Sequence, residues 1–171
     1  MRFLIGALLS LGCATTVVPS TIPQRENVVI GVENRSLTDA SKLAISLWWT
    51  ATDGAFDPNL VWKCNDVTVC IREVKGSIAE CNGEEGSFNG CFVDGEILIA
   101  DNFNPKHKTD AIMHQIGHFL KIRHQAWGLM DPDRDPDVKV AACIDDVTLS
   151  QLPASWKENR RFNVVCLSGP R

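Results

Sequence analysis

The chain concentrates three of its four histidines within eleven residues: His114, His118 and His124. Histidines four residues apart leave the same face of an α-helix about one turn apart, so His114 and His118 can bind one metal ion. A zinc–nitrogen bond is only about 2.0–2.1 Å long, so His124 can join them only if the helix ends near residues 120–121 and the chain doubles back. A lone helical pair is more often a surface feature, but the third histidine favours a zinc site. The fourth histidine, His107, lies between two lysines and is interpreted as solvated surface.

The histidine segment resembles the metzincin metalloprotease motif, His-Glu-x-x-His-x-x-Gly-x-x-His followed by a methionine turn. The three histidines match, and Met130 stands six residues after His124. The resemblance implies that the histidines hold Zn²⁺ and that Met130 forms a hydrophobic floor beneath it, although an ordinary core methionine is the alternative. The order strand, helix, strands, helix and then an irregular tail indicates an α/β or α+β domain with a small irregular C-terminal lobe. The resemblance implies that this α+β, α/β-like domain is a metzincin-like catalytic domain, with a twisted mixed sheet backed by helices.

Two residues depart from the motif. Gln115 stands where the family has its general-base glutamate. A neutral amide can hold water by a hydrogen bond but cannot accept its proton, and loss of a general base costs about 10²–10⁴-fold in rate. Lys121 replaces the motif glycine, where a positive φ would cost a lysine about 1–2 kcal/mol. Whether Gln115 is natural or introduced stays open.

The leading hypothesis is therefore a zinc-binding metzincin-like metallopeptidase domain that is weak or inactive as written. Its expected partner is a peptide or protein in an extended conformation, because in an active relative a strand above the helix pairs with such a peptide. The candidate strand is 95–101, through Ile97, Leu98 and Ile99. Two alternatives are an active secreted endopeptidase that uses another base, such as Glu84 or Glu85, and a non-enzymatic, zinc-stabilised peptide-binding module.

Hydrophobic patterning predicts the elements that would position this site. The expected strands are 27–33, 60–63, 67–74 and 95–101, and the expected helices run from 36 to 48 and onward from Thr109 or Asp110. A Gly- and Asn-rich stretch, 81–90, is predicted to be a loop, and one or two helical turns are expected at 147–152. The length favours a single domain over 27–171, expected to be a monomer. With a net charge of −4, nucleic-acid binding is not expected.

Six of the seven cysteines follow the N-terminal region, which is an even number in a chain that looks exported. Three disulfides are therefore expected, although six cysteines permit 15 pairings. Local pairing is the simplest scheme: Cys64–Cys70, Cys81–Cys91 and Cys143–Cys166.

The N-terminus has the charged start and short apolar run of a signal peptide, assigned to residues 1–12. Residues 12–14 fit ordinary signal peptidase cleavage, whereas residues 10–13 form an imperfect bacterial lipobox with lipidation at Cys13. A polar tether, 13–26, would then carry the domain. We expect an exported protein, either lipid-anchored to a bacterial envelope, with membrane attachment through Cys13, or secreted.

Overall fold

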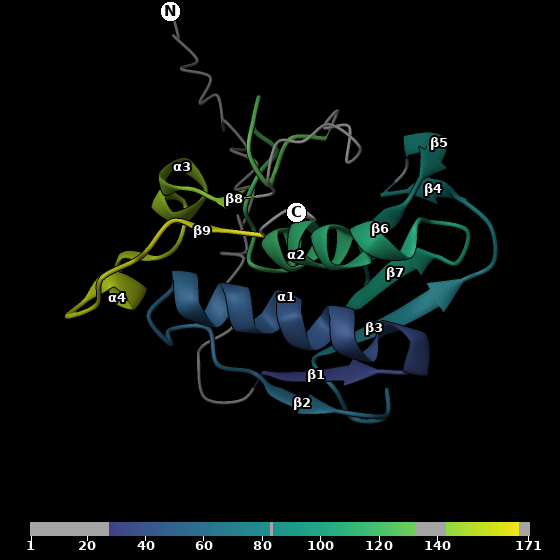
Figure 1. The fold of residues 1–171 in the computed structure, drawn as a ribbon, viewed down its shortest axis with the longest axis horizontal. Coiled ribbons are helices and arrows are strands. Elements are labelled where there is room, and N and C mark those ends of the chain that lie inside the picture. The colour runs from purple at the N-terminus through teal and green to yellow at the C-terminus, as the bar shows by residue number, and fades with distance from the viewer. Residues whose placement is uncertain (1–27, 83, 133–142, 168–171) are drawn as a thin grey trace, which may run out of the picture.

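The computed structural model describes residues 28–82, 84–132 and 143–167, and only the backbone of residues 84–88. The predicted signal peptide, the lipidation site Cys13 and the tether lie outside the described residues. Within the described part of the chain, no helix is long and apolar enough to span a membrane. Figure 1 shows the arrangement of the described elements.

The main sheet has five strands in the order β2-β1-β3-β7-β6. Four of them are parallel, and the end strand β6 runs antiparallel to β7. The bounds are β1 Val29–Val32, β2 Asn59–Val61, β3 Val69–Val74, β7 Glu96–Ala100 and β6 Gly90–Val93. The predicted strands are all present, somewhat shortened, and the predicted mixed sheet backed by helices in an α+β fold is confirmed.

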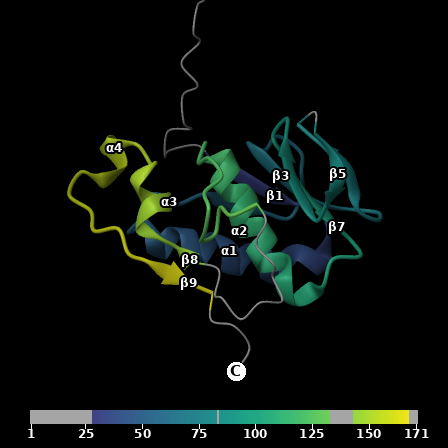
Figure 2. The same ribbon diagram turned by 90° about the horizontal axis from the view of Figure 1, so that it is seen from above.

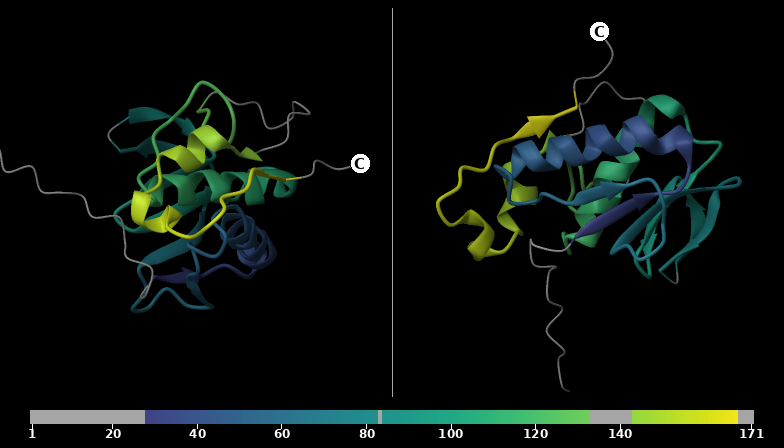
Figure 3. Two further views of the ribbon diagram at one scale, coloured as in Figure 1. Left: turned by 90° about the vertical axis from the view of Figure 1, so that its left-hand side faces the viewer. Right: turned by 90° about the horizontal axis from the view of Figure 1, so that it is seen from below.

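Both long helices, α1 (Thr38–Ala51) and α2 (Lys108–Phe119), cover one face of this sheet (Figures 1 and 3). Each follows a 3₁₀ turn, η2 (Arg35–Leu37) and η3 (Pro105–His107) respectively. Alternate residues of β1, β3 and β7 point to this face and are buried there, since side chains alternate along a strand and registered parallel neighbours share a face. They are Ile30, Val32, Val69, Ile71, Ile97 and Ile99.

Two buried polar contacts fix α2 against its neighbours. The indole Nε1 of Trp48, in α1, donates to the Met113 carbonyl of α2 at 3.0 Å. Lys108, the first residue of α2, forms an ion pair with Glu73 of β3 in which both side chains are largely buried. Removing one partner of such a pair leaves an uncompensated charge, so these contacts specify where α2 begins and how it lies on the sheet.

The prediction of a loop over 81–90 is wrong. The segment forms a hairpin of β4 (Ile78–Cys81) and β5 (Glu84–Phe88), followed by β6. Asn82, with φ of 53°, begins the two-residue connection between the paired residues Cys81 and Glu84. An Asn-Gly pair is a strong signal for this tight turn, and it outweighs the loop-like composition. The candidate bases Glu84 and Glu85 thus lie in β5.

The C-terminal part forms a small lobe of two short helices and a two-stranded ribbon (Figure 2). The helices are α3 (Asp146–Ser150) and α4 (Ala154–Lys157), and the strands are β8 (Cys143–Ile144) and β9 (Val165–Cys166). The backbone N–H of Asn163 donates to the Ala51 carbonyl at the end of α1. The predicted helical turn at 147–152 is confirmed, whereas the C-terminal part expected to be irregular contains these two helices and the paired strands β8 and β9.

Three disulfides join the pairs expected from local pairing: Cys64–Cys70, Cys81–Cys91 and Cys143–Cys166. The first lies on the sheet face opposite the helices, the second ties the β4–β5 hairpin to β6, and the third links β8 to β9. Disulfides form and persist in oxidising compartments. The fold therefore indicates an extracellular or otherwise oxidising environment.

Candidate metal centre

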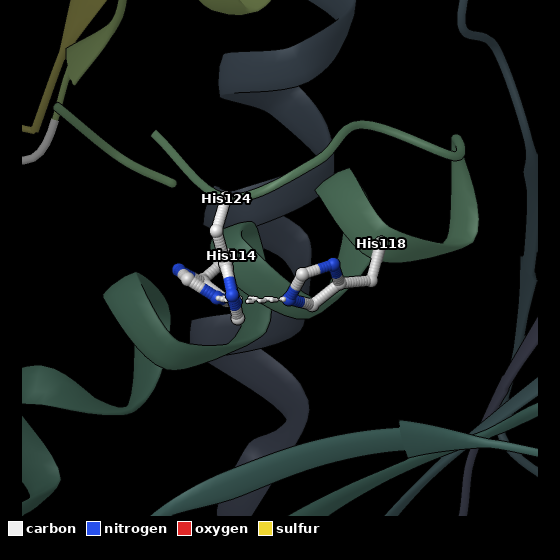
Figure 4. A group of neighbouring side chains, drawn as sticks. All are labelled: His114, His118 and His124. Atoms are coloured by element: carbon white, nitrogen blue, oxygen red, sulfur yellow. Dashed lines mark hydrogen bonds between the residues drawn. The ribbon is translucent and has the colours of Figure 1, made fainter. Parts of the chain in front are cut away.

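The imidazole rings of His114, His118 and His124 converge on one point (Figure 4). The Nε2 atom of His118 lies 3.0 Å from that of His114 and 3.0 Å from that of His124. The third Nε2–Nε2 distance, between His114 and His124, is 3.3 Å. The structure thus brings together all three histidines that the sequence singles out.

These separations fit a tetrahedral metal ion. An ion bonded to three nitrogens at about 2.0–2.1 Å requires nitrogen–nitrogen distances of about 3.3–3.4 Å, and the observed distances of 3.0–3.3 Å lie within a few tenths of an ångström of that. Three neutral imidazoles are also a donor set suited to zinc and its neighbours in the transition series. The three histidines can therefore hold a metal ion.

Hydrogen bonds on the far side of the rings orient two of the ligands. The Nδ1–H of His114 donates to the Leu129 carbonyl at 2.7 Å, and because a carbonyl only accepts, Nε2 of this ring keeps its lone pair. His118 is hydrogen-bonded to the backbone of Ile122. The sequence does not predict the hydrogen bond from His114 to Leu129, because the acceptor is a backbone carbonyl, which every residue type has.

A tight reversal at the end of α2 returns His124 to the other two histidines. The Lys121 N–H donates to the His118 carbonyl and the Ile122 N–H to the Gly117 carbonyl, both at 2.9 Å. These two bonds, with Lys121 in the left-handed region at φ of 63°, form a Schellman motif. Lys121 therefore has the positive φ that the motif glycine predicted for this position.

Met130 packs against α2 at Gly117. It is fully buried, and a Cβ atom built on Gly117 would overlap its Sδ. Gly117 is therefore required for the close approach of Met130 to the helix between His114 and His118. A glycine inside a helix costs about 1 kcal/mol relative to alanine. Its presence at position 117 of a predicted helix could therefore have indicated close packing against another segment.

Gln115 lies between the two helical histidines and is only 6% exposed. Its Oε1 has no hydrogen-bond partner among the described residues. A Cβ atom built on Gly90 of β6 would lie 3.3 Å from Gln115 Nε2, so the glycine allows the amide to pack directly under the edge strand. The position of the expected general base is thus buried, beside the ligands, and occupied by a neutral amide.

The expectation that Ile97, Leu98 and Ile99 pair with a peptide is wrong. They belong to β7, which is hydrogen-bonded to β3 on one side and β6 on the other, so neither edge is free. The end strand on this side is β6. A short-range pattern identifies a strand but not its place in the sheet, because strand order depends on pairing between distant segments.

The register between β6 and β7 determines which backbone N–H and C=O groups of β6 point away from the sheet. The Ala100 N–H donates to the Asn89 carbonyl, so residues 89 and 100 form a hydrogen-bonded pair. Bonded and non-bonded pairs alternate in antiparallel strands, which turns the backbone groups of Gly90 and Phe92 away from β7. The Phe92 carbonyl is already used by Asn82 Nδ2 at 3.1 Å, so the Gly90 end, beside Gln115, offers the groups for a further strand.

Burial keeps the site in the form that binds a metal. Desolvation lowers the pKa of His114 below 6.5, with the neighbouring His124 acting in the same direction and the Leu129 hydrogen bond opposing it. The same desolvation, reinforced by His114 and His124, lowers the pKa of His118 to about 4. Metal ligands must be deprotonated, and at neutral pH protons do not compete for these two rings.

The left-handed conformation of Lys121 predicts that Lys121→Gly stabilises the protein. Relief of about 1–2 kcal/mol of backbone strain exceeds the added freedom of glycine in the unfolded chain, about 0.4–1 kcal/mol. The expected net gain is about 0.5–1 kcal/mol in the free energy of unfolding, measured by denaturant titration. Lys75→Gly is the matched control, because this exposed loop lysine lacks a positive φ and its replacement should destabilise. Equal losses in both variants would contradict the assigned turn.

The lowered pKa values predict that the metal-free protein loses stability on acidification. The unfolded chain titrates near 6.5 and folded His118 near 4, so between these values the unfolded state binds more protons. The stabilising contribution is complete above about pH 6.5 and is lost as the pH falls towards 4. Chelator-treated protein should melt at progressively lower temperature across this window. The drop should be smaller in His118→Asn, and an identical drop in both proteins would refute the assignment.

Comparisons with known proteins do not place the chain in a family. No protein-family model matches the sequence, and no curated protein matches it significantly. The functional interpretation therefore rests on the residues of this chain and their geometry.

Proposed function

We propose that the protein is a zinc-binding, metzincin-like metallopeptidase domain whose hydrolytic activity is weak or absent as the sequence stands. The convergence of three imidazole Nε2 atoms at 3.0–3.3 Å carries this proposal. In the parts of the chain that the structure describes, the group able to hold an ion consists of these histidines alone. Three protein ligands with an open fourth position are typical of catalytic zinc, whereas structural zinc normally has four protein ligands.

The chemistry of the site divides between the metal and the chain. Zinc, when bound, supplies a Lewis acid that polarises a carbonyl oxygen. The chain supplies the orientation of His114 through Leu129 and an exposed approach on the side of His124. At the position of the general base, Gln115 can donate and accept hydrogen bonds but cannot take up a proton. The missing proton acceptor is the reason for expecting weak hydrolysis.

The proposed ligand is a peptide or protein segment in an extended conformation, lying along β6. Its support is the outward-facing backbone of Gly90, which lies at the free end of the sheet and next to Gln115. Strand addition at such an edge provides main-chain hydrogen bonds without requiring a specific sequence. The same strand would thus align a peptide and bring it to the metal centre.

The protein is proposed to act outside the cytoplasm. The three disulfides indicate an oxidising environment, in agreement with the signal peptide expected at residues 1–12. Attachment to a membrane through a lipid on Cys13 is part of this proposal, with simple secretion as the alternative. Metabolic labelling with a fatty acid in a bacterial host, compared between the unsubstituted chain and Cys13→Ser, distinguishes the two.

The first prediction from this function concerns metal content. Protein purified without chelator should contain about one zinc per molecule, because the three nitrogens form an open catalytic-type site. His118→Ala should remove the zinc, as measured by elemental analysis. His107→Ala is the matched control, since this histidine lies outside the cluster and its loss should leave zinc unchanged. A zinc content near zero, or one unaffected by His118→Ala, would refute the metal centre.

The second prediction concerns the missing base. Gln115→Glu introduces a carboxylate that can accept a proton, and hydrolysis of an unstructured protein substrate should rise by about 10²-fold or more. Asn102→Asp adds the same charge at an exposed position in the loop between β7 and η3 and should leave the rate unchanged. The combined Gln115→Glu and Lys121→Gly variant restores the whole motif and keeps the test valid if the turn limits the rate. If that variant folds, binds zinc and cleaves none of a broad peptide panel, a non-enzymatic binding module replaces the peptidase proposal.

A further inference from the structure

Trp127 is the most exposed large hydrophobic side chain in the part of the chain that the structure describes, at 71%. It lies in the segment that joins His124, the exposed ligand of the metal centre, to the buried Met130. A single exposed apolar residue is common on protein surfaces and carries no meaning alone. The position and the surroundings of Trp127, however, connect it to the proposed peptide-binding site.

Hydrogen bonds on both sides of Trp127 fix the backbone that presents it. The Gln125 N–H donates to the Met130 carbonyl at 3.0 Å. The Leu129 N–H donates to the Cys143 carbonyl at 3.1 Å. Because these bonds close the segment, a ligand that contacts the indole does not have to order a free loop, and the entropy cost of binding is smaller.

Two further exposed apolar side chains, Val147 and Val164, lie around the same segment. The Asp145 carboxylate packs against Gly128, where an added Cβ atom would overlap it. Val147 follows Asp145 by two residues and is 52% exposed. Val164, 51% exposed, comes directly before β9, and Asp145 comes directly after β8, so the antiparallel pairing of these strands brings the two residues close together. Trp127 and the two valines thus border one contact, and we call them the Trp127 patch.

The Trp127 patch lies within reach of a peptide that is bound at the metal centre. Consecutive Cα atoms are about 3.8 Å apart, so the Cα atom of Trp127 lies within about 11 Å of that of His124. It lies within about 8 Å of that of Leu129, whose carbonyl accepts the hydrogen bond from His114. An extended peptide advances about 3.3 Å per residue, so these separations span about three residues. Figure 4 shows the segment that carries His124 passing over the ligand-bearing face of α2.

We propose that the Trp127 patch contacts a large apolar side chain of the extended peptide and so determines which sequences the metal centre accepts. Strand addition at β6 supplies main-chain hydrogen bonds that every sequence offers equally, so side-chain selection requires another surface. The patch presents three uncharged apolar side chains, which favour leucine or an aromatic residue over a polar one. This inference rests on the proposed peptide-binding metal centre but not on hydrolysis.

The test measures binding of short peptides to the full, zinc-loaded chain by isothermal titration calorimetry. The parent is an acetylated and amidated heptapeptide of alanine and serine, and a series of variants carries one leucine at each position in turn. Leucine at the position that meets the patch should raise the affinity about 10-fold, because contact with the patch removes its apolar surface from water.

Substitutions in the patch then identify the side chain that selects leucine. Trp127→Ala should reduce the preference from about 10-fold to about 2-fold, because the indole supplies most of the apolar area, and Trp127→Phe should keep most of it. Trp62→Ala is the matched control, since this tryptophan is 51% exposed, follows the end strand β2 and stacks with Lys42. Zinc content reports whether the ligands are intact, and Val147→Ser gives an independent test if Trp127→Ala loses zinc.

The possible results separate this inference from the proposed function. Peptide binding without a leucine preference, or a preference that survives the substitutions in the patch, overturns the inference and leaves the peptide proposal standing. If zinc is bound and no peptide binds, both are overturned and the metal centre stands. Self-association of the chain that is lost in Trp127→Ala would assign the patch to a second copy. Binding to phosphatidylcholine vesicles that is lost in this variant would assign it to a membrane, and either result overturns the inference.

Discussion

The candidate site depends on the reversal of the chain at the end of α2. If the helix continued, His124 would lie about 15 Å along the axis from His114, out of reach of a shared ion. Two backbone hydrogen bonds and one left-handed residue, Lys121, close the helix instead. The same turn buries Ile122 and directs the following segment back over the helix, where Leu129 and Met130 meet it.

The helix itself is a rigid support because its other contacts are buried. Ile112, Met113 and Ile116 are fully buried in the core, while the ion pair of Lys108 with Glu73 fixes its start. Gly117 contributes by having no side chain, which lets Met130 approach the backbone. Metal ligands on such an element keep their geometry when the ion leaves, since little in the core can rearrange.

The sequence predicted what depends on local spacing and missed what depends on long-range pairing. Histidines four residues apart predict a shared face because helix geometry is regular, whereas His124 joins them only through the turn at Lys121. The short cysteine separations predicted the disulfides. The position of β7 inside the sheet depends on β3 and β6, which no local pattern of Ile97–Ile99 encodes. The Asn-Gly pair at residues 82–83 is a local signal for the β4–β5 hairpin, but the Gly- and Asn-rich composition of 81–90 led to the prediction of a loop. The Leu129 carbonyl and the unpartnered Gln115 oxygen become visible only when the fold assembles them.

The disulfide between Cys143 and Cys166 has a consequence for the order of maturation. The Cys143 carbonyl accepts a hydrogen bond from the Leu129 N–H at 3.1 Å, and the Leu129 carbonyl in turn orients His114. A covalent link in the C-terminal lobe thus supports the imidazole of a ligand through one intervening residue. Under the proposed function, loss of this disulfide would loosen that support and lower the affinity of the three histidines for a metal ion. Oxidative folding would then precede metal loading.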